Sequence, residues 1–218
     1  MERRRPSAEG CGLGRGSAAG YARRALNLPN KLTVLRLILT ALLVVVLSTP
    51  LPEKWTVGLL IFIVASLTDY WDGMLARKLN LITNFGKLMD PLADKVLMAA
   101  VFVLLCADGW IPAWVVVAVL AREFIVTGMR LVAGSQGQVL AAEALGKHKT
   151  IWQIVAASYY LTMLATSEWL LGWLAPVFEW RPLSPDIMGT LLIVIMAALT
   201  LASGVRYFWN NRHLFADA

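Results

Sequence analysis

The sequence is poor in charged residues and in the side chains that bind zinc or copper. Only 16% of its 218 residues are charged, whereas soluble domains carry about 25%. It contains two histidines and two cysteines, and Cys11 and Cys106 have no metal-ligand spacing and form no disulfide framework. These shortages argue against a soluble domain and against a fold built on zinc or disulfides.

Long hydrophobic runs make up most of the chain, because 58% of the residues are hydrophobic. A bilayer span needs roughly 20 mostly apolar residues. The sequence therefore predicts an all-α, polytopic membrane bundle of six transmembrane helices. The expected spans are Leu32–Leu47, Trp55–Arg77, Leu88–Ala107, Ile111–Ala133, Lys149–Thr166 and Ile187–Trp209.

Lysine and arginine are divided unequally among the connections between these spans. Most lie before the first span, between spans two and three, between spans four and five, or at the C-terminal end. The other three connections contain only Lys54 and Arg181. The positive-inside rule therefore places both termini in the cytoplasm. The formal net charge of +6 suits anionic lipids or substrates better than nucleic acid, because the charges are spread between spans.

The chain divides into a tail, one domain and a short C-terminal segment. Residues 1–26 are rich in Gly, Ser, Ala and Arg and are expected to be a flexible basic tail. Within it, Tyr21–Leu28 is read either as an interfacial helix or as a solvated linker. A transit peptide is a competing interpretation, which Glu2 and Glu9 disfavour. Residues 27–212 form the predicted six-helix domain, and 213–218 form the C-terminal tail.

Acidic residues near the end of the second span need an explanation, because charge inside a membrane span is costly. Asp69 and Asp72 are three residues apart, and on a helix they share a face with Gly73 and Ala76. The stripe thus combines two carboxylates with two small residues that allow close approach of a ligand or a helix. This pattern favours a functional site.

A second acidic stripe opens the third span, where Gly86, Asp90 and Asp94 follow one another at intervals of four residues. The short connection makes the two helices adjacent and antiparallel, so the four aspartates are expected to lie together. Hard divalent cations prefer such oxygen ligands. The alternative is a salt-bridged helix end, in which the acids pair with neighbouring basic residues; those are Arg77, Lys78, Lys87 and Lys95.

The combined spacing resembles the signature of the CDP-alcohol phosphatidyltransferase family. It reads Asp69-x2-Asp72-Gly73-x2-Ala76-Arg77-x8-Gly86-x3-Asp90-x3-Asp94. The resemblance implies that the four aspartates bind Mg²⁺ or Mn²⁺, as two ions, and that Asp94 is also the general base. It further implies a set of contacts to the CDP-lipid; these are Asn30, Thr33, Gly73, Ala76, Arg77, Thr83 and Gly86.

A basic group near the cytoplasmic edge suggests a phosphorylated acceptor. Arg130, Lys147 and Lys149 offer donors that suit a phosphate, with Arg122 nearby. Glu123 shares a helix face with Arg130, seven residues later, and is expected to form an ion pair inside the bundle.

Four stretches resemble the members of the family that use sn-glycerol 3-phosphate as acceptor. They are Leu28-Pro29-Asn30-x2-Thr33-x2-Arg36, Asp90-Pro91-x-Ala93-Asp94-Lys95, Arg122-Glu123 and Gly146-Lys147-x-Lys149-Thr150. The resemblance implies transfer of the phosphatidyl group from CDP-diacylglycerol, giving phosphatidylglycerophosphate and releasing CMP during phospholipid biosynthesis. It also implies a homodimer with its active site facing the cytoplasm, in a bacterial inner membrane or an organelle inner membrane. Two alternatives stay open: another acceptor, such as inositol phosphate or serine, and a divalent cation transporter.

Overall fold

The computed structural model describes residues 28–79, 84–135 and 144–212, and these residues form helices and short connections without any strand. Six long helices correspond to the six expected spans and confirm the all-α prediction. They are α2 (Leu28–Ser48), α3 (Lys54–Leu79), α4 (Asn84–Ala107), α5 (Ala113–Ser135), α6 (Ala144–Ala165) and α8 (Thr190–Asn210). Residues 1–27, including most of the proposed interfacial helix, and the C-terminal tail lie outside the described residues.

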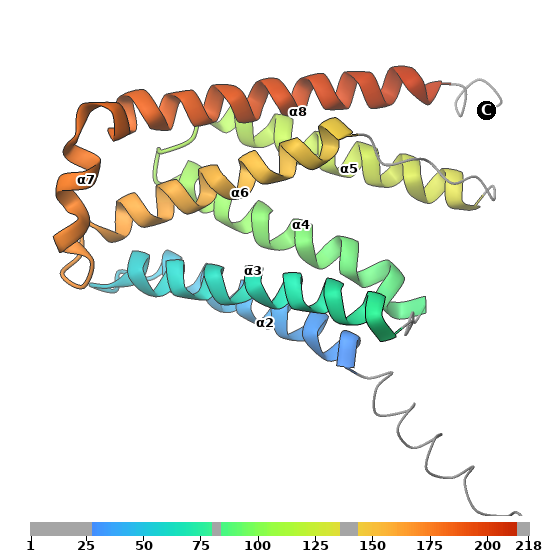
Figure 1. Cartoon of the computed structure of the whole chain (residues 1–218), viewed down its shortest axis with the longest axis horizontal. Helices are drawn as coiled ribbons and strands as arrows, with labels where there is room; N and C mark the ends of the chain where they lie inside the picture. Colours follow the sequence, from blue (N-terminus) through green and yellow to red (C-terminus); the bar gives the residue numbers. More distant parts are fainter. Residues whose placement is uncertain (1–27, 80–83, 136–143, 213–218) are drawn as a thin grey trace, which may run out of the picture.

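Successive long helices run in alternating directions (Figure 1). The start of α2, the end of α3 and the start of α4 lie at one end of the bundle, together with the last turns of α5 and α8 and the first turn of α6. We call this the motif end. The connections 49–53, 108–112 and 166–189 lie at the opposite end. Helix α2 packs against α3 and α4, α6 packs against α3 and α8, and α5 packs against α8.

The connection from α6 to α8 contains four short helical segments that the sequence reasoning missed. They are η1 (Gly172–Leu174), α7 (Ala175–Glu179), η2 (Arg181–Leu183) and η3 (Pro185–Gly189). Prolines lie in the first turn of α7, η2 and η3, where the missing N–H costs no helical hydrogen bond. At the same end, Gly109 has a φ of 80° between α4 and α5, a conformation that glycine adopts without strain.

Helices α2 and α3 pack closely where Gly58 faces Leu47. A Cβ atom at Gly58 would lie 2.6 Å from Cδ2 of Leu47, so a larger residue at this position would require the Leu47 side chain to shift. The core around this contact is apolar and continuous across the helices; its fully buried members include Leu43, Phe62, Val101, Phe102, Leu105, Leu161 and Met196.

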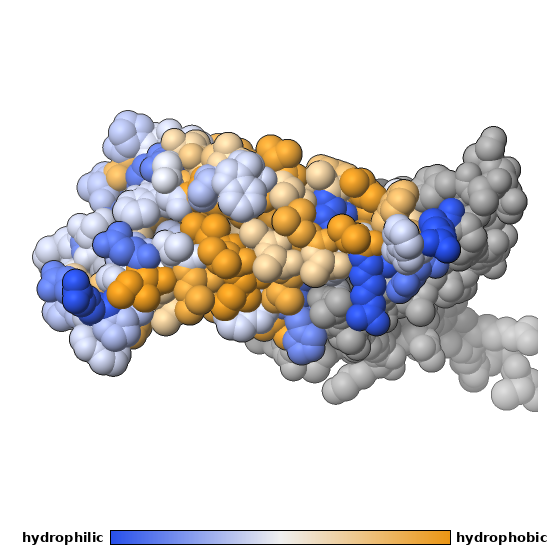
Figure 2. All heavy atoms as spheres, turned by 90° about the horizontal axis from the view of Figure 1, so that it is seen from above, coloured by the Kyte–Doolittle hydropathy of each residue, from blue (hydrophilic) through white to orange (hydrophobic). Residues whose placement is uncertain are grey.

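The outer surface is apolar as well. Figure 2 shows a broad hydrophobic band across the middle of one face, with hydrophilic residues toward its ends. Large side chains such as Val45, Val117, Phe124 and Val205 are each more than 60% exposed. A soluble bundle would not expose so much contiguous apolar surface. By length and composition, one described stretch, Arg181–Asn210, is long and apolar enough to cross a membrane, and Thr33–Ser48, Lys54–Thr68 and Lys95–Ala107 are shorter apolar helices.

The opposite end is held together by a carboxylate from a distant part of the chain. The two side-chain oxygens of Glu168 accept hydrogen bonds from the backbone N–H groups of Trp55 and Thr56, each at 2.8 Å. These N–H groups belong to the first turn of α3 and have no partner within the helix. Glu168 therefore caps α3 and ties it to the connection that follows α6.

Candidate active site

The aspartates of the motif lie on two helices that meet at the motif end. Asp69 and Asp72 are in the last three turns of α3, and Asp90 and Asp94 are in the first three turns of α4. Figure 1 shows the end of α3 and the start of α4 at the same end of the bundle. The two helices therefore run antiparallel, as expected, and adjoin at this end, while along its length α4 packs mainly against α2.

The helical backbone preserves the spacing on which the prediction depends. Residues three and four apart on a helix share a face, which places each pair of aspartates on one stripe. The donor set consists of carboxylates alone and therefore fits a hard divalent cation such as Mg²⁺ or Mn²⁺. The structure does not describe the side chains of the four aspartates, of Ala76 or of Arg77. Thr83 lies outside the described residues altogether.

The N-terminal turns of α2 lie at the same end of the bundle. They contain Asn30 and Thr33, the expected contacts to the CDP-lipid. Thr33 is 1% exposed and Arg36, one turn later, is also 1% exposed. Arg36 is a charged side chain buried in the helix that packs against both α3 and α4, and such burial is costly unless polar groups surround it.

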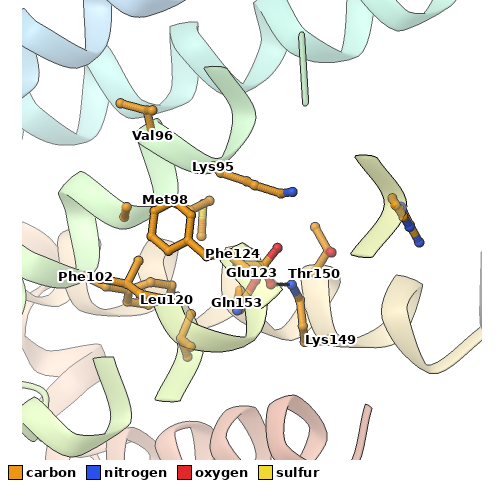
Figure 3. A pocket seen from close by; sticks show the side chains of 13 residues that line it. Lys95, Val96, Met98, Phe102, Leu120, Glu123, Phe124, Lys149, Thr150 and Gln153 are labelled. Carbon is orange, nitrogen blue, oxygen red and sulfur yellow. Dashed lines mark hydrogen bonds and ion pairs between the residues drawn. The ribbon is translucent and has the colours of Figure 1, made fainter. Parts of the chain in front are cut away.

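A cavity of about 280 Å³ lies among α4, α5 and α6 (Figure 3). Its walls are apolar toward the middle of the bundle, where Met98, Phe102 and Leu120 line it. Polar and charged side chains line the remainder; these are Lys95, Glu123, Arg130, Lys149, Thr150 and Gln153. Such a lining combines apolar contact with a few charged groups that can orient a ligand.

The strongest charges in this cavity are paired. Lys149 of α6 donates to the carboxylate of Glu123 on α5, and Arg122 Nη1 lies 3.2 Å from the same carboxylate oxygen. The Lys149 side chain is 3% exposed, and the side chains of Glu123 and Arg122 are 15% and 12% exposed. Two cations facing one carboxylate leave an excess of positive charge, which is the electrostatic condition for binding an anion.

Lys95 connects this cavity to the motif helix, because it follows Asp94 directly in α4. Its amino group donates to Oγ1 of Thr127, which in turn donates to the backbone oxygen of Glu123 at 2.6 Å. The amino group points into the cavity in Figure 3. The cavity therefore adjoins the helix that carries Asp90 and Asp94.

The ion pair that we expected for Glu123 is present, but its partners are Lys149 and Arg122. Arg130, which shares its helix face, lies against Tyr207 of α8 instead. The guanidinium lies 5.6 Å from the centre of the Tyr207 ring, and Nε donates to the tyrosine hydroxyl at 3.3 Å. Seven residues along a helix span roughly 10 Å, so the lysine on the neighbouring helix is closer to Glu123.

A profile of the CDP-alcohol phosphatidyltransferase family matches residues 26–181, which include both acidic helices and the cavity. The chain belongs to this family. Three relatives carry the name CDP-diacylglycerol–glycerol-3-phosphate 3-phosphatidyltransferase. The Bacillus subtilis protein is 45% identical over 62% of this chain and 76% of its own length. The Rickettsia bellii protein is 34% identical over 84% and 93%, and the Salmonella choleraesuis protein 36% identical over 83% and 92%.

Within this CDP-alcohol phosphatidyltransferase, the four expected acceptor residues are not all in one place. Arg130 and Lys149 line the same cavity. Arg122 reaches it only through Glu123, and it also lines a groove of about 340 Å³ between α5 and α8, beside Gly204. The side chain of Lys147 lies outside what the structure describes.

Two polar residues of the cavity are absent from the predicted acceptor site. In the prediction from sequence, Lys95 is only a partner for the acidic motif, and Gln153 has no role. A signal for each was present, because Lys95 is adjacent to Asp94 and Gln153 follows Lys149 by four residues, one helical turn.

Proposed function

We propose that the protein transfers the phosphatidyl group of CDP-diacylglycerol to sn-glycerol 3-phosphate, giving phosphatidylglycerophosphate and CMP in phospholipid biosynthesis. The names of the relatives support this reaction. The observation that carries it is the cavity beside α4, because its basic lining suits an acceptor with a phosphate group. A bare alcohol such as serine or choline would not need that lining.

We assign the donor site to the acidic hairpin. Asp69, Asp72, Asp90 and Asp94 would hold two Mg²⁺ or Mn²⁺ ions, which supply charge neutralisation for the diphosphate of CDP-diacylglycerol when bound. The remaining contacts to the nucleotide and diphosphate come from the helix termini around the hairpin; these are Asn30, Thr33, Gly73, Ala76, Arg77, Thr83 and Gly86.

In the proposed reaction, Asp94 acts as the general base. It takes the proton from the 1-hydroxyl of glycerol 3-phosphate, and the resulting oxygen attacks the lipid-side phosphorus. A new phosphorus–oxygen bond forms to the acceptor while the bond to the CMP oxygen breaks, so that CMP leaves with the bonding electrons. Most of the rate enhancement comes from positioning and from stabilising charge.

The acceptor is oriented by the basic residues between α5 and α6. Arg130 and Lys149 would contact its phosphate directly, and Lys147 would add a further cation at the motif end. Arg122 shares the Glu123 carboxylate with Lys149, and this sharing leaves positive charge on Lys149 available to the phosphate.

We propose that the six long helices of residues 27–212 span a bacterial inner membrane, with both termini and the motif end in the cytoplasm. The distribution of Lys and Arg supports this orientation. A homodimer is the proposed assembly. Cysteine labelling from each side of the membrane at the two ends of the bundle tests the orientation.

The reaction is tested by release of CMP from CDP-diacylglycerol with a panel of acceptors and added Mg²⁺. We expect turnover with glycerol 3-phosphate and none with inositol phosphate or serine. Turnover with serine alone would overturn the acceptor assignment. Passage of metal ions into liposomes without any turnover would favour the transporter alternative.

A further inference from the structure

Gln153 is a buried polar side chain in the cavity that the proposed mechanism does not use. The residue is 3% exposed and lies on α6, one turn after Lys149. Among the described residues, its amide nitrogen Nε2 is buried and has no hydrogen-bond partner. Figure 3 shows it next to Glu123 and Lys149 on the cavity wall. Buried amide donors are normally satisfied, so this one calls for an explanation.

The other polar groups of the cavity already have protein partners. Lys149 and Arg122 bind Glu123, Lys95 binds Thr127, and the hydroxyl of Thr150 donates to the backbone oxygen of Gly146 at 3.2 Å. An uncharged amide left available beside these groups is suited to an uncharged polar ligand atom rather than to the phosphate, for which cations are the stronger partners.

We infer that Gln153 is a specificity-determining residue that hydrogen-bonds the 2-hydroxyl of glycerol 3-phosphate. This inference rests on the proposed function. With the phosphate at Lys149 and Arg130, a ligand reaching one turn along α6, roughly 6 Å, brings a hydroxyl to the Gln153 amide. A hydroxyl both accepts from Nε2 and donates to Oε1, so the pairing holds for either orientation of the amide.

The hydroxyl assignment predicts discrimination against one particular analogue. 3-Hydroxypropyl phosphate has the phosphate and the reacting terminal hydroxyl of glycerol 3-phosphate but lacks the 2-hydroxyl. The wild-type enzyme should use it with a kcat/KM about tenfold lower, the effect of one neutral hydrogen bond. Equal kcat/KM values for the two acceptors in the wild type would overturn the inference without any variant.

The variant Gln153→Leu tests whether Gln153 is the source of the preference for glycerol 3-phosphate over this analogue. It should lower kcat/KM for glycerol 3-phosphate about tenfold and leave 3-hydroxypropyl phosphate unchanged, so that the preference disappears. Thr200→Val is the matched control. Thr200 is also fully buried with an unpartnered hydroxyl among the described residues, but it lies on α8 outside this cavity. This variant should keep the preference.

The outcomes separate this inference from the proposed function. If neither acceptor supports CMP release by the wild type, the proposed function fails. If glycerol 3-phosphate is used and Gln153→Leu retains the wild-type preference, only the role of Gln153 is wrong. Gln153→Met, which keeps the length of the side chain, should behave like Gln153→Leu and provides the same comparison if the leucine variant does not fold.

Discussion

The two ends of the bundle use lysine–carboxylate pairs in different ways. At the opposite end, Lys54 and Asp108 lie 3.5 Å apart with 26% and 41% of their side chains exposed. At the motif end, the pair of Lys149 and Glu123 is buried and faces a cavity. An exposed pair contributes little to stability, whereas a buried pair has a large desolvation cost that its attraction only partly offsets.

This comparison separates an exposed pair at one end from a buried pair at a cavity, which the proposed function assigns to the acceptor site. The carboxylate of Glu168 satisfies two orphan N–H groups of α3, and no cavity is needed for that role. The charges around Glu123 are retained in the interior in spite of their cost, next to polar groups that a ligand can reach. Buried charges of this kind are found at functional sites.

The largest effect should follow from Asp94→Asn. Removing the proposed general base should lower the rate of CMP release by at least about a hundredfold, while circular dichroism and the thermal unfolding midpoint in detergent stay near those of the wild type. Asp108→Asn, at the opposite end, is the control and should retain activity. Wild-type activity in Asp94→Asn would show that another group takes the proton.

Next in size is Lys149→Met, which leaves the Glu123 carboxylate without its main partner. We expect a loss of about 3 kcal/mol in the free energy of unfolding, measured in detergent, and a raised KM for glycerol 3-phosphate. The double variant Glu123→Gln/Lys149→Met should recover most of the stability but not the KM. Recovery of both would mean that Lys149 has only a structural role.

Glu168→Ala should have a smaller effect, and it should lower the free energy of unfolding without changing the kinetic constants. It removes both acceptors from the first turn of α3, which should cost about 2 kcal/mol in the free energy of unfolding. KM and kcat measured below the unfolding temperature should stay at wild-type values, because Glu168 lies at the end away from the motif. A change in KM for either substrate would contradict the proposal that the opposite end is structural and the motif end binds the substrates.

The smallest effect should come from Lys54→Met. Its pair with Asp108 is partly exposed, and exposed pairs are worth less than about 1 kcal/mol. The unfolding midpoint of the variant and the wild type should become equal as salt is added, because salt screens exposed charges. A loss of stability as large as that of Lys149→Met would contradict the contrast between exposed and buried pairs.

Much of the fold could be predicted from the order of hydrophobic and polar residues. Six apolar runs separated by turn residues indicated six long helices, and each is present. The boundaries were less accurate. Helix α6 begins at Ala144, ahead of the apolar run, because helical hydrogen bonds continue through polar residues, whereas hydrophobicity marks only the part suited to the membrane interior. The short helices between α6 and α8 gave no periodic signal.

By itself, the sequence determined the acidic motif, since the spacing of Asp69, Asp72, Asp90 and Asp94 is a property of the chain and of helical periodicity. It also determined that basic residues gather near one end. Only the tertiary structure decided that Lys149 pairs with Glu123, that Arg130 lies against Tyr207, and that Gln153 lines the cavity among α4, α5 and α6. These contacts join different helices, and their identity depends on how the helices are rotated and packed against one another, which periodicity along a single helix does not specify.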